Sequence, residues 1–229
     1  MEAKLKNFTN EALLTEPKVT TFSNHGALQT QLCSETIKTF WKLIDEAKNN
    51  PINMNNVLAG QISSSLRLNK NSPELTDFCQ KIIPKMVNTY MENFKGLPIK
   101  YNNNKTNYPT LALDELWVNF QKEGEFNPIH DHNGAFSFVI WMKIPTSSIE
   151  QNETLIASNS NTKGLVSNFC FTYIDILGNL GNHVYNMEKN IEGIMVMFPS
   201  RLNHQVFPFY NNKDTRVSIS GNLGVHSKN

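Results

Sequence analysis

The chain has 229 residues, of which 39% are hydrophobic, and its formal net charge is only +1 at pH 7. This length, with 14 Phe among the aromatic residues, predicts one folded domain with a sizeable core and excludes a disordered chain. Lysines and arginines are scattered, so the sequence gives no indication of a nucleic-acid partner. No apolar run approaches the roughly 20 residues that a membrane-spanning helix needs, so no membrane partner is expected.

The cysteines indicate the redox setting. Cys33, Cys79 and Cys170 lie far apart in apolar contexts, which predicts buried, reduced thiols and no disulfide framework. The segment from Met1 to Leu14 lacks the apolar run of a signal peptide. We therefore expect a reducing, cytoplasmic location.

The first hundred residues have a mainly helical pattern. Apolar residues recur at helical spacing over residues 28–48, and the sequence Asn49-Asn50-Pro51 ends that helix because proline cannot continue the hydrogen-bond ladder. A second helix begins after Ser72, a good N-cap, and Pro84 is expected to kink it. Gly96 is its expected C-terminal stop.

The remainder of the chain has the pattern of β-strands. Alternating or continuously apolar segments separated by Gly, Asn and Pro predict strands at Leu116–Phe120, Phe136–Ile144, Phe169–Ile176, Ile194–Phe198, Gln205–Phe209 and Arg216–Asn222. Short strands without helices between them favour an antiparallel sandwich or jelly roll. The predicted fold class is therefore α+β, with the N-terminal helices packed on one sheet.

Three of the six histidines lie where predicted strands begin or end. His130 and His132 precede the strand at residue 136 and, in an extended chain, would face the same side while Asp131 faces away. His204 lies between two later strands, which a jelly roll can bring beside the first pair. Together they form a candidate metal site, although imidazole suits Fe, Zn, Cu and Ni alike.

A second candidate site follows on the last strand. Arg216, Ser218 and Ser220 share one face, while Val217 and Ile219 share the other. A guanidinium binds a carboxylate through two parallel hydrogen bonds, so Arg216 is a candidate carboxylate receptor. The alternative is a surface arginine on an edge strand.

Two motifs in this order carry a family resemblance. Residues 126–134, followed by 137–145, resemble the first metal motif of the 2-oxoglutarate/iron(II) oxygenase superfamily, and especially prolyl-4-hydroxylase-like proteins of phages and marine bacteria. Residues 197–204, followed by 216–220, are similar to the second motif: a distal histidine and then Arg-x-Ser. The resemblance covers about residues 114–223.

The resemblance implies a double-stranded β-helix whose cofactors are Fe(II) and 2-oxoglutarate. Residues 101–229 would form the oxygenase core and residues 1–100 a mainly helical extension, together as one structural domain. The metal would be held by His130, His132 and His204. The cosubstrate would bind to Arg216 and Ser218, with Asn119 lining the pocket from a neighbouring strand.

One position departs from the family pattern. The superfamily has Asp or Glu two residues after the first histidine, whereas this chain has His132 there. A three-histidine site is the favoured interpretation, and Asp131 is an alternative ligand if the strand bulges.

The expected activity is hydroxylation of a C–H bond in a peptidyl side chain or a small molecule. Two other functions remain open: a metal-dependent cupin-like enzyme that does not use 2-oxoglutarate, favoured by His132, and a non-catalytic jelly-roll binding module. The helical region is compatible with a substrate groove or a homodimer interface. If the protein is phage-encoded, its expected location is the cytoplasm of the host cell.

Overall fold

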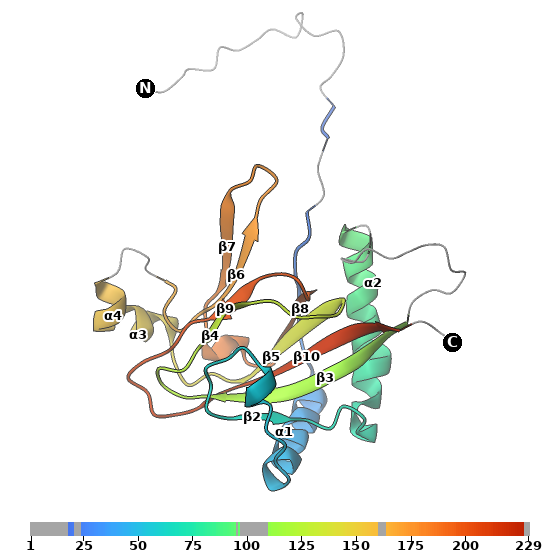
Figure 1. Cartoon of the computed structure of the whole chain (residues 1–229), viewed down its shortest axis with the longest axis horizontal. Helices are drawn as coiled ribbons and strands as arrows, with labels where there is room; N and C mark the ends of the chain where they lie inside the picture. The colour runs from blue at the N-terminus through green and yellow to red at the C-terminus, as the bar shows by residue number, and fades with distance from the viewer. Residues whose placement is uncertain (1–17, 21–23, 95, 97–109, 160–163, 227–229) are drawn as a thin grey trace, which may run out of the picture.

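The computed structural model describes residues 18–20, 24–94, 96, 110–159 and 164–226. Their strands form two antiparallel sheets (Figure 1). The six-stranded sheet contains, in spatial order, β1 (Leu28–Gln31), β8 (Ile194–Pro199), β5 (Phe136–Lys143), β10 (Arg216–His226), β3 (Thr110–Gln121) and β2 (Ser65–Arg67). The four-stranded sheet contains β4 (Asn127–His130), β9 (His204–Val206), β6 (Phe169–Ile174) and β7 (Leu180–Tyr185).

The order in which the chain visits the two sheets defines the architecture. From β3 to β10, successive strands alternate between the sheets, except for the β6–β7 hairpin within the smaller one. Apolar residues of both sheets, among them Trp141 and Phe169, pack between them. This is a jelly roll of the double-stranded β-helix kind, as predicted.

Two helices cover the outer face of the six-stranded sheet. They are α1 (Ser34–Asn49) and α2 (Ile83–Phe94). Phe40 and Ile44 of α1, and Tyr90 of α2, are fully buried against sheet residues such as Phe136 and Ile140. The predicted packing of N-terminal helices on one sheet is therefore confirmed, and Figure 1 shows both helices beside that sheet.

The start of the first predicted helix was wrong. Residues 28–31 form strand β1, which pairs with β8, and the helix begins only at Ser34. This pairing satisfies backbone groups of β8, which lies far away in the sequence. Local apolar spacing alone therefore could not reveal strand β1. With β2 at the opposite edge, the N-terminal region supplies both edge strands of the larger sheet. The predicted boundary near residue 100 lies outside the described residues.

The second predicted helix is three consecutive helical segments. Ser72 caps the 3₁₀ turn Pro73–Leu75, a π-helical turn spans Phe78–Ile82, and α2 follows. The π-helical turn lies directly before Pro84, where the missing N–H and the proline ring disturb regular α-helical bonding. The helix is thus irregular next to Pro84, as a π-helical turn, and the kink itself stays a prediction.

The predicted β-strands are present with shifted ends, and four short strands were missed. The missed strands are β1, β2, β4 and β7, each with six residues or fewer.

The cysteines are less buried than predicted. Only Cys170 is buried, and Cys33 is exposed, so the prediction of buried thiols was wrong for Cys33. The short helices are η2 (Asn55–Val57), α3 (Ser148–Asn152), α4 (Leu155–Ser158) and η5 (Lys189–Ile191). No helix within the described residues is both long and apolar enough to cross a membrane.

Candidate active site

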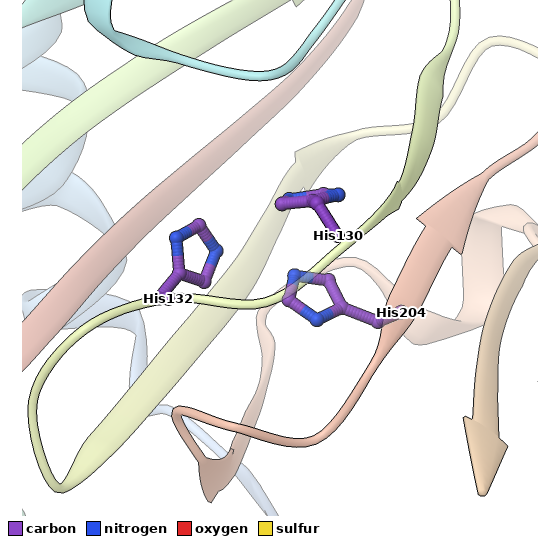
Figure 2. A group of neighbouring side chains, drawn as sticks. All are labelled: His130, His132 and His204. Atoms are coloured by element: carbon purple, nitrogen blue, oxygen red, sulfur yellow. The ribbon is translucent and has the colours of Figure 1, made fainter.

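The structure brings the three predicted histidines together between the sheets. His130 ends β4 and His204 begins β9, and the two residues face each other in the β4–β9 pairing. His132 lies in the loop that follows β4. One ring nitrogen from each side chain lies within 4.8 Å of the other two. Figure 2 shows the three rings gathered around a common space.

A tight turn places His132 beside the other two histidines. The backbone N–H of His132 donates to the carbonyl of Ser200 (2.8 Å), which ties the loop to the end of β8. Gly134 follows with φ +107°, and a Cβ at this position would lie 2.7 Å from the carbonyl oxygen of Leu223. Only glycine fits this turn without strain.

Hydrogen bonds fix the orientation of two of the rings. Nδ1 of His130 lies 2.7 Å from the carbonyl of Pro128, and Nδ1 of His204 lies 2.9 Å from the carbonyl of Leu202. Each Nδ1–H therefore donates to backbone, which leaves Nε2 free to bind a metal. The ring of His132 has no such partner among the described residues and instead meets Trp117 edge to face.

Burial keeps these imidazoles neutral. Desolvation lowers the pKa of His204 to about 3 and that of His132 to about 4, and it also lowers the pKa of His130. The nearby His130 lowers the first two pKa values further by charge repulsion. Three unprotonated nitrogen donors at this spacing fit a divalent first-row metal such as Fe(II).

The alternative ligand Asp131 lies outside this cluster. Its carboxylate forms an ion pair with Arg201 (3.1 Å), which is 67% exposed. The structure therefore does not favour the ligand set that uses Asp131.

Arg216 lies in the same space between the sheets as the three histidines. It is only 3% exposed, and its guanidinium donates to Gln121, Thr146 (3.3 Å) and Ser167 (2.5 Å) while lying over the ring of Phe209. Its Nε has no hydrogen-bond partner, and no acidic side chain pairs with it among the described residues. Burial lowers the pKa of Arg216 to about 9, so the group still carries its charge at pH 7.

One pocket joins the histidines to Arg216. Ser218 and Asn119 also line it, on paired positions of β10 and β3. Asn119 is held by the hydroxyl of Ser65, which donates to its Oδ1 (2.8 Å). The pocket is otherwise mainly apolar, as small-molecule sites usually are. Lys143, the cationic residue at the end of β5, lies outside the pocket and pairs with Asp214.

Sequence reasoning missed two parts of this site. Thr146 and Ser167, which hold the guanidinium, lie in loops without a recognisable motif. Residues 58–60 and Ile62, from the N-terminal region, line the pocket. This loop is tied to the β-core by a bridge between Gln61 and Phe126. The place of this loop in the pocket could not be read from the sequence.

The family comparison supports the resemblance. The model of the family described as "Putative 2OG-Fe(II) oxygenase" matches residues 115–222, from β3 to β10. This range contains the three histidines, Arg216, Ser218 and Asn119. A comparison with curated proteins finds no match.

Several solved structures share the fold of this chain. A prolyl-4-hydroxylase from Pseudomonas putida has a TM-score of 0.51 at 13% identity, with 87% of this chain and 92% of that chain covered. The non-heme alpha-ketoglutarate-dependent epimerase SnoN from nogalamycin biosynthesis has a TM-score of 0.51 at 11% identity, with 86% and 76% covered. The carbocyclase SnoK from the same biosynthesis has a TM-score of 0.50 at 10% identity, with 89% and 80% covered.

Residues 115–222, which form most of the β-core, thus match a family of 2-oxoglutarate-dependent oxygenases, an enzyme class whose cofactors are Fe(II) and 2-oxoglutarate. The resemblance predicted from the two sequence motifs is thus confirmed. Its prolyl-4-hydroxylase-like character agrees with the fold of the Pseudomonas putida enzyme.

Proposed function

We propose that this protein is an Fe(II)- and 2-oxoglutarate-dependent hydroxylase in which His130, His132 and His204 hold the iron. Arg216, with Ser218 beside it, binds the distal carboxylate of 2-oxoglutarate. The observation that carries this proposal is a buried guanidinium, without an acidic partner among the described residues, in the pocket that also contains the histidines.

The state of Arg216 supports a carboxylate ligand. Burying an unpaired cation is costly, and a buried charge is normally paired or neutralised. The described side chains offer Arg216 only neutral acceptors. A dicarboxylate that reaches from the metal to Arg216 would neutralise the guanidinium and could accept a hydrogen bond from Ser218.

The chain's own residues orient the reactants and exclude water. The backbone carbonyls of Pro128 and Leu202 accept hydrogen bonds from Nδ1 of His130 and His204 and so set which imidazole nitrogen faces the metal. Asn119 and the apolar walls confine the cosubstrate. When bound, Fe(II) supplies the oxidation of a C–H bond by dioxygen, coupled to conversion of 2-oxoglutarate to succinate and CO2.

The substrate that we propose carries its reactive C–H bond in a peptidyl side chain or a small molecule. The fold shared with a prolyl-4-hydroxylase favours the first and the fold shared with SnoN and SnoK the second. The cytoplasmic location and the homodimer stay predictions.

The direct test is succinate production from 2-oxoglutarate with Fe(II) and oxygen, with and without candidate peptides. We expect turnover in the wild type. We expect His204→Ala to abolish both metal binding and turnover, since it removes the most deeply buried donor. His183→Ala, on the exposed part of β7, is the matched control and should behave as wild type. Wild-type metal content in His204→Ala would remove His204 from the site.

A metal-dependent enzyme without 2-oxoglutarate is the second candidate, because His132 replaces the family's carboxylate. A titration of the metal-loaded protein with 2-oxoglutarate separates the two functions. Saturable binding that depends on Arg216 supports the hydroxylase, and absence of binding supports the alternative.

A further inference from the structure

The candidate active site is short of negative charge. Its lining includes three neutral imidazoles and one buried guanidinium, but no Asp or Glu among the described residues. Asp131, which lies between His130 and His132 in the sequence, is engaged by Arg201 in an ion pair. A divalent metal here would therefore keep its full charge in a mainly apolar pocket.

We propose that the metal and the dicarboxylate bind to this site as a mutually dependent pair, because the chain supplies a negative group to neither of them. The proposal rests on the proposed function and concerns how the same site is filled. It makes His132, in the place of a carboxylate, the residue that sets the strength of the dependence.

The charges explain the direction of the effect. With Fe(II) bound, the histidines and Arg216 would enclose three positive charges, and 2-oxoglutarate contributes two negative ones. Interactions between charges are several times stronger in a buried pocket than in water. Each ligand therefore relieves repulsion or desolvation that the other suffers alone, and thermodynamic linkage requires the two effects on affinity to be equal.

A carboxylate at position 132 would reduce the dependence. It would neutralise part of the metal's charge before 2-oxoglutarate arrives and would repel the incoming anion. His132→Asp should thus bind Fe(II) alone more tightly and gain less from 2-oxoglutarate. This substitution needs little rearrangement, because the ring of His132 has no hydrogen-bond partner to lose among the described residues.

The experiment measures Fe(II) affinity of the metal-free full chain under argon, with and without saturating 2-oxoglutarate. The affinity for 2-oxoglutarate is measured with and without Fe(II). In the wild type we expect each ligand to tighten the other by the same factor, roughly 10- to 100-fold, within the range of coupled sites. In His132→Asp we expect Fe(II) alone to bind about ten-fold more tightly and the coupling factor to fall several-fold.

Two controls separate charge from other causes. His183→Asp makes the same change on exposed β7 and should leave both affinities and the coupling factor unchanged. Succinate is a dianion that lacks the 2-oxo group. It should still raise the Fe(II) affinity of the wild-type protein, whereas neutral succinamide should not. The succinate comparison also tests the proposal if His132→Asp does not fold.

The outcomes are distinct. Equal Fe(II) affinity with and without 2-oxoglutarate, an undiminished factor in folded His132→Asp, or no difference between succinate and succinamide would overturn the mutual dependence. These results would leave the proposed hydroxylase function in place. Absence of 2-oxoglutarate binding even with Fe(II) would overturn both.

Discussion

The two faces of the six-stranded sheet divide stability from function. On β5, Phe136 and Ile140 face the helices and are fully buried in an apolar core. Ser137 and Trp141, which alternate with them, face the other sheet and line the pocket. Because side chains of a strand alternate between faces, one segment supplies both a packed layer and a binding surface.

The same division holds on β10. Val217 and Ile219 belong to the helix-covered core, whereas Arg216, Ser218 and Ser220 line the pocket. The outer face is closed by apolar contacts, and the inner face retains the buried cation of Arg216, whose Nε has no hydrogen-bond partner among the described residues. Substitutions on the outer side should therefore change folding stability, and those on the inner side should change ligand affinity.

The largest expected effect is on the outer side. Phe40 of α1 is fully buried and packs edge to face on Phe78 (ring centroids 5.1 Å apart). Phe40→Ala should lower the free energy of unfolding by about 3–5 kcal/mol through lost burial and a cavity. Denaturant titration measures this loss, and Val57→Ala, an exposed position, is the control. A loss below about 1 kcal/mol would contradict the packing role.

Arg216→Ala, on the inner side, should change ligand affinity and not folding stability. We expect 2-oxoglutarate binding to weaken by about 2–5 kcal/mol, the usual loss when one partner of a desolvated charge pair is removed. The ligand-free protein should not lose stability, because the substitution removes an unpaired buried charge. Calorimetry measures the first effect and denaturant titration the second. An unchanged affinity would exclude Arg216 as the carboxylate receptor.

Gly134→Ala should moderately lower both folding stability and metal affinity. Its φ of +107° and the 2.7 Å approach to Leu223 predict a loss of stability of about 1–3 kcal/mol. Metal affinity should fall as well, because His132 lies in the same turn. Gly124→Ala also has a positive φ but meets no atom within 4 Å, so it separates backbone conformation from the steric contact. Equal effects of the two variants would mean that the contact is unimportant.

The smallest expected effect is that of Ser218→Ala. Loss of one hydroxyl donor should weaken 2-oxoglutarate binding by about 0.5–1.5 kcal/mol and leave stability near that of the wild type. Ser220→Ala, two residues further along the same face, provides the comparison. If Ser220→Ala weakens 2-oxoglutarate more than Ser218→Ala, the predicted position of the distal carboxylate is wrong.

The contrast between the faces also explains which features could be predicted from sequence. Periodic apolar residues revealed the main helices and the long strands, since burial on one face imposes a regular pattern. The spacing of His130 and His132 and the alternation around Arg216 indicated two candidate sites. The proximity of His204 depends on pairing with a residue 74 positions earlier, which required the family's fold to anticipate.

The features that were missed depend on contacts between distant segments. Strand β1 has only four residues and is defined by its partner β8, not by its own composition. Thr146 and Ser167 reach Arg216 from separate loops, and no local pattern marks a hydroxyl that will meet a guanidinium. Such contacts arise only when the chain has folded.

The attachment of the N-terminal region has a practical consequence for dissecting this enzyme. A fragment that begins at residue 101 would lack β1 and β2, which would leave the backbone edges of β8 and β3 open to pairing with other chains. It would also lack the loop at residues 58–62 and therefore one wall of the pocket. Truncation at residue 101 would thus yield an aggregation-prone β-core whose pocket is open to solvent, and loss of activity in such a fragment would say nothing about a separate role for the helices.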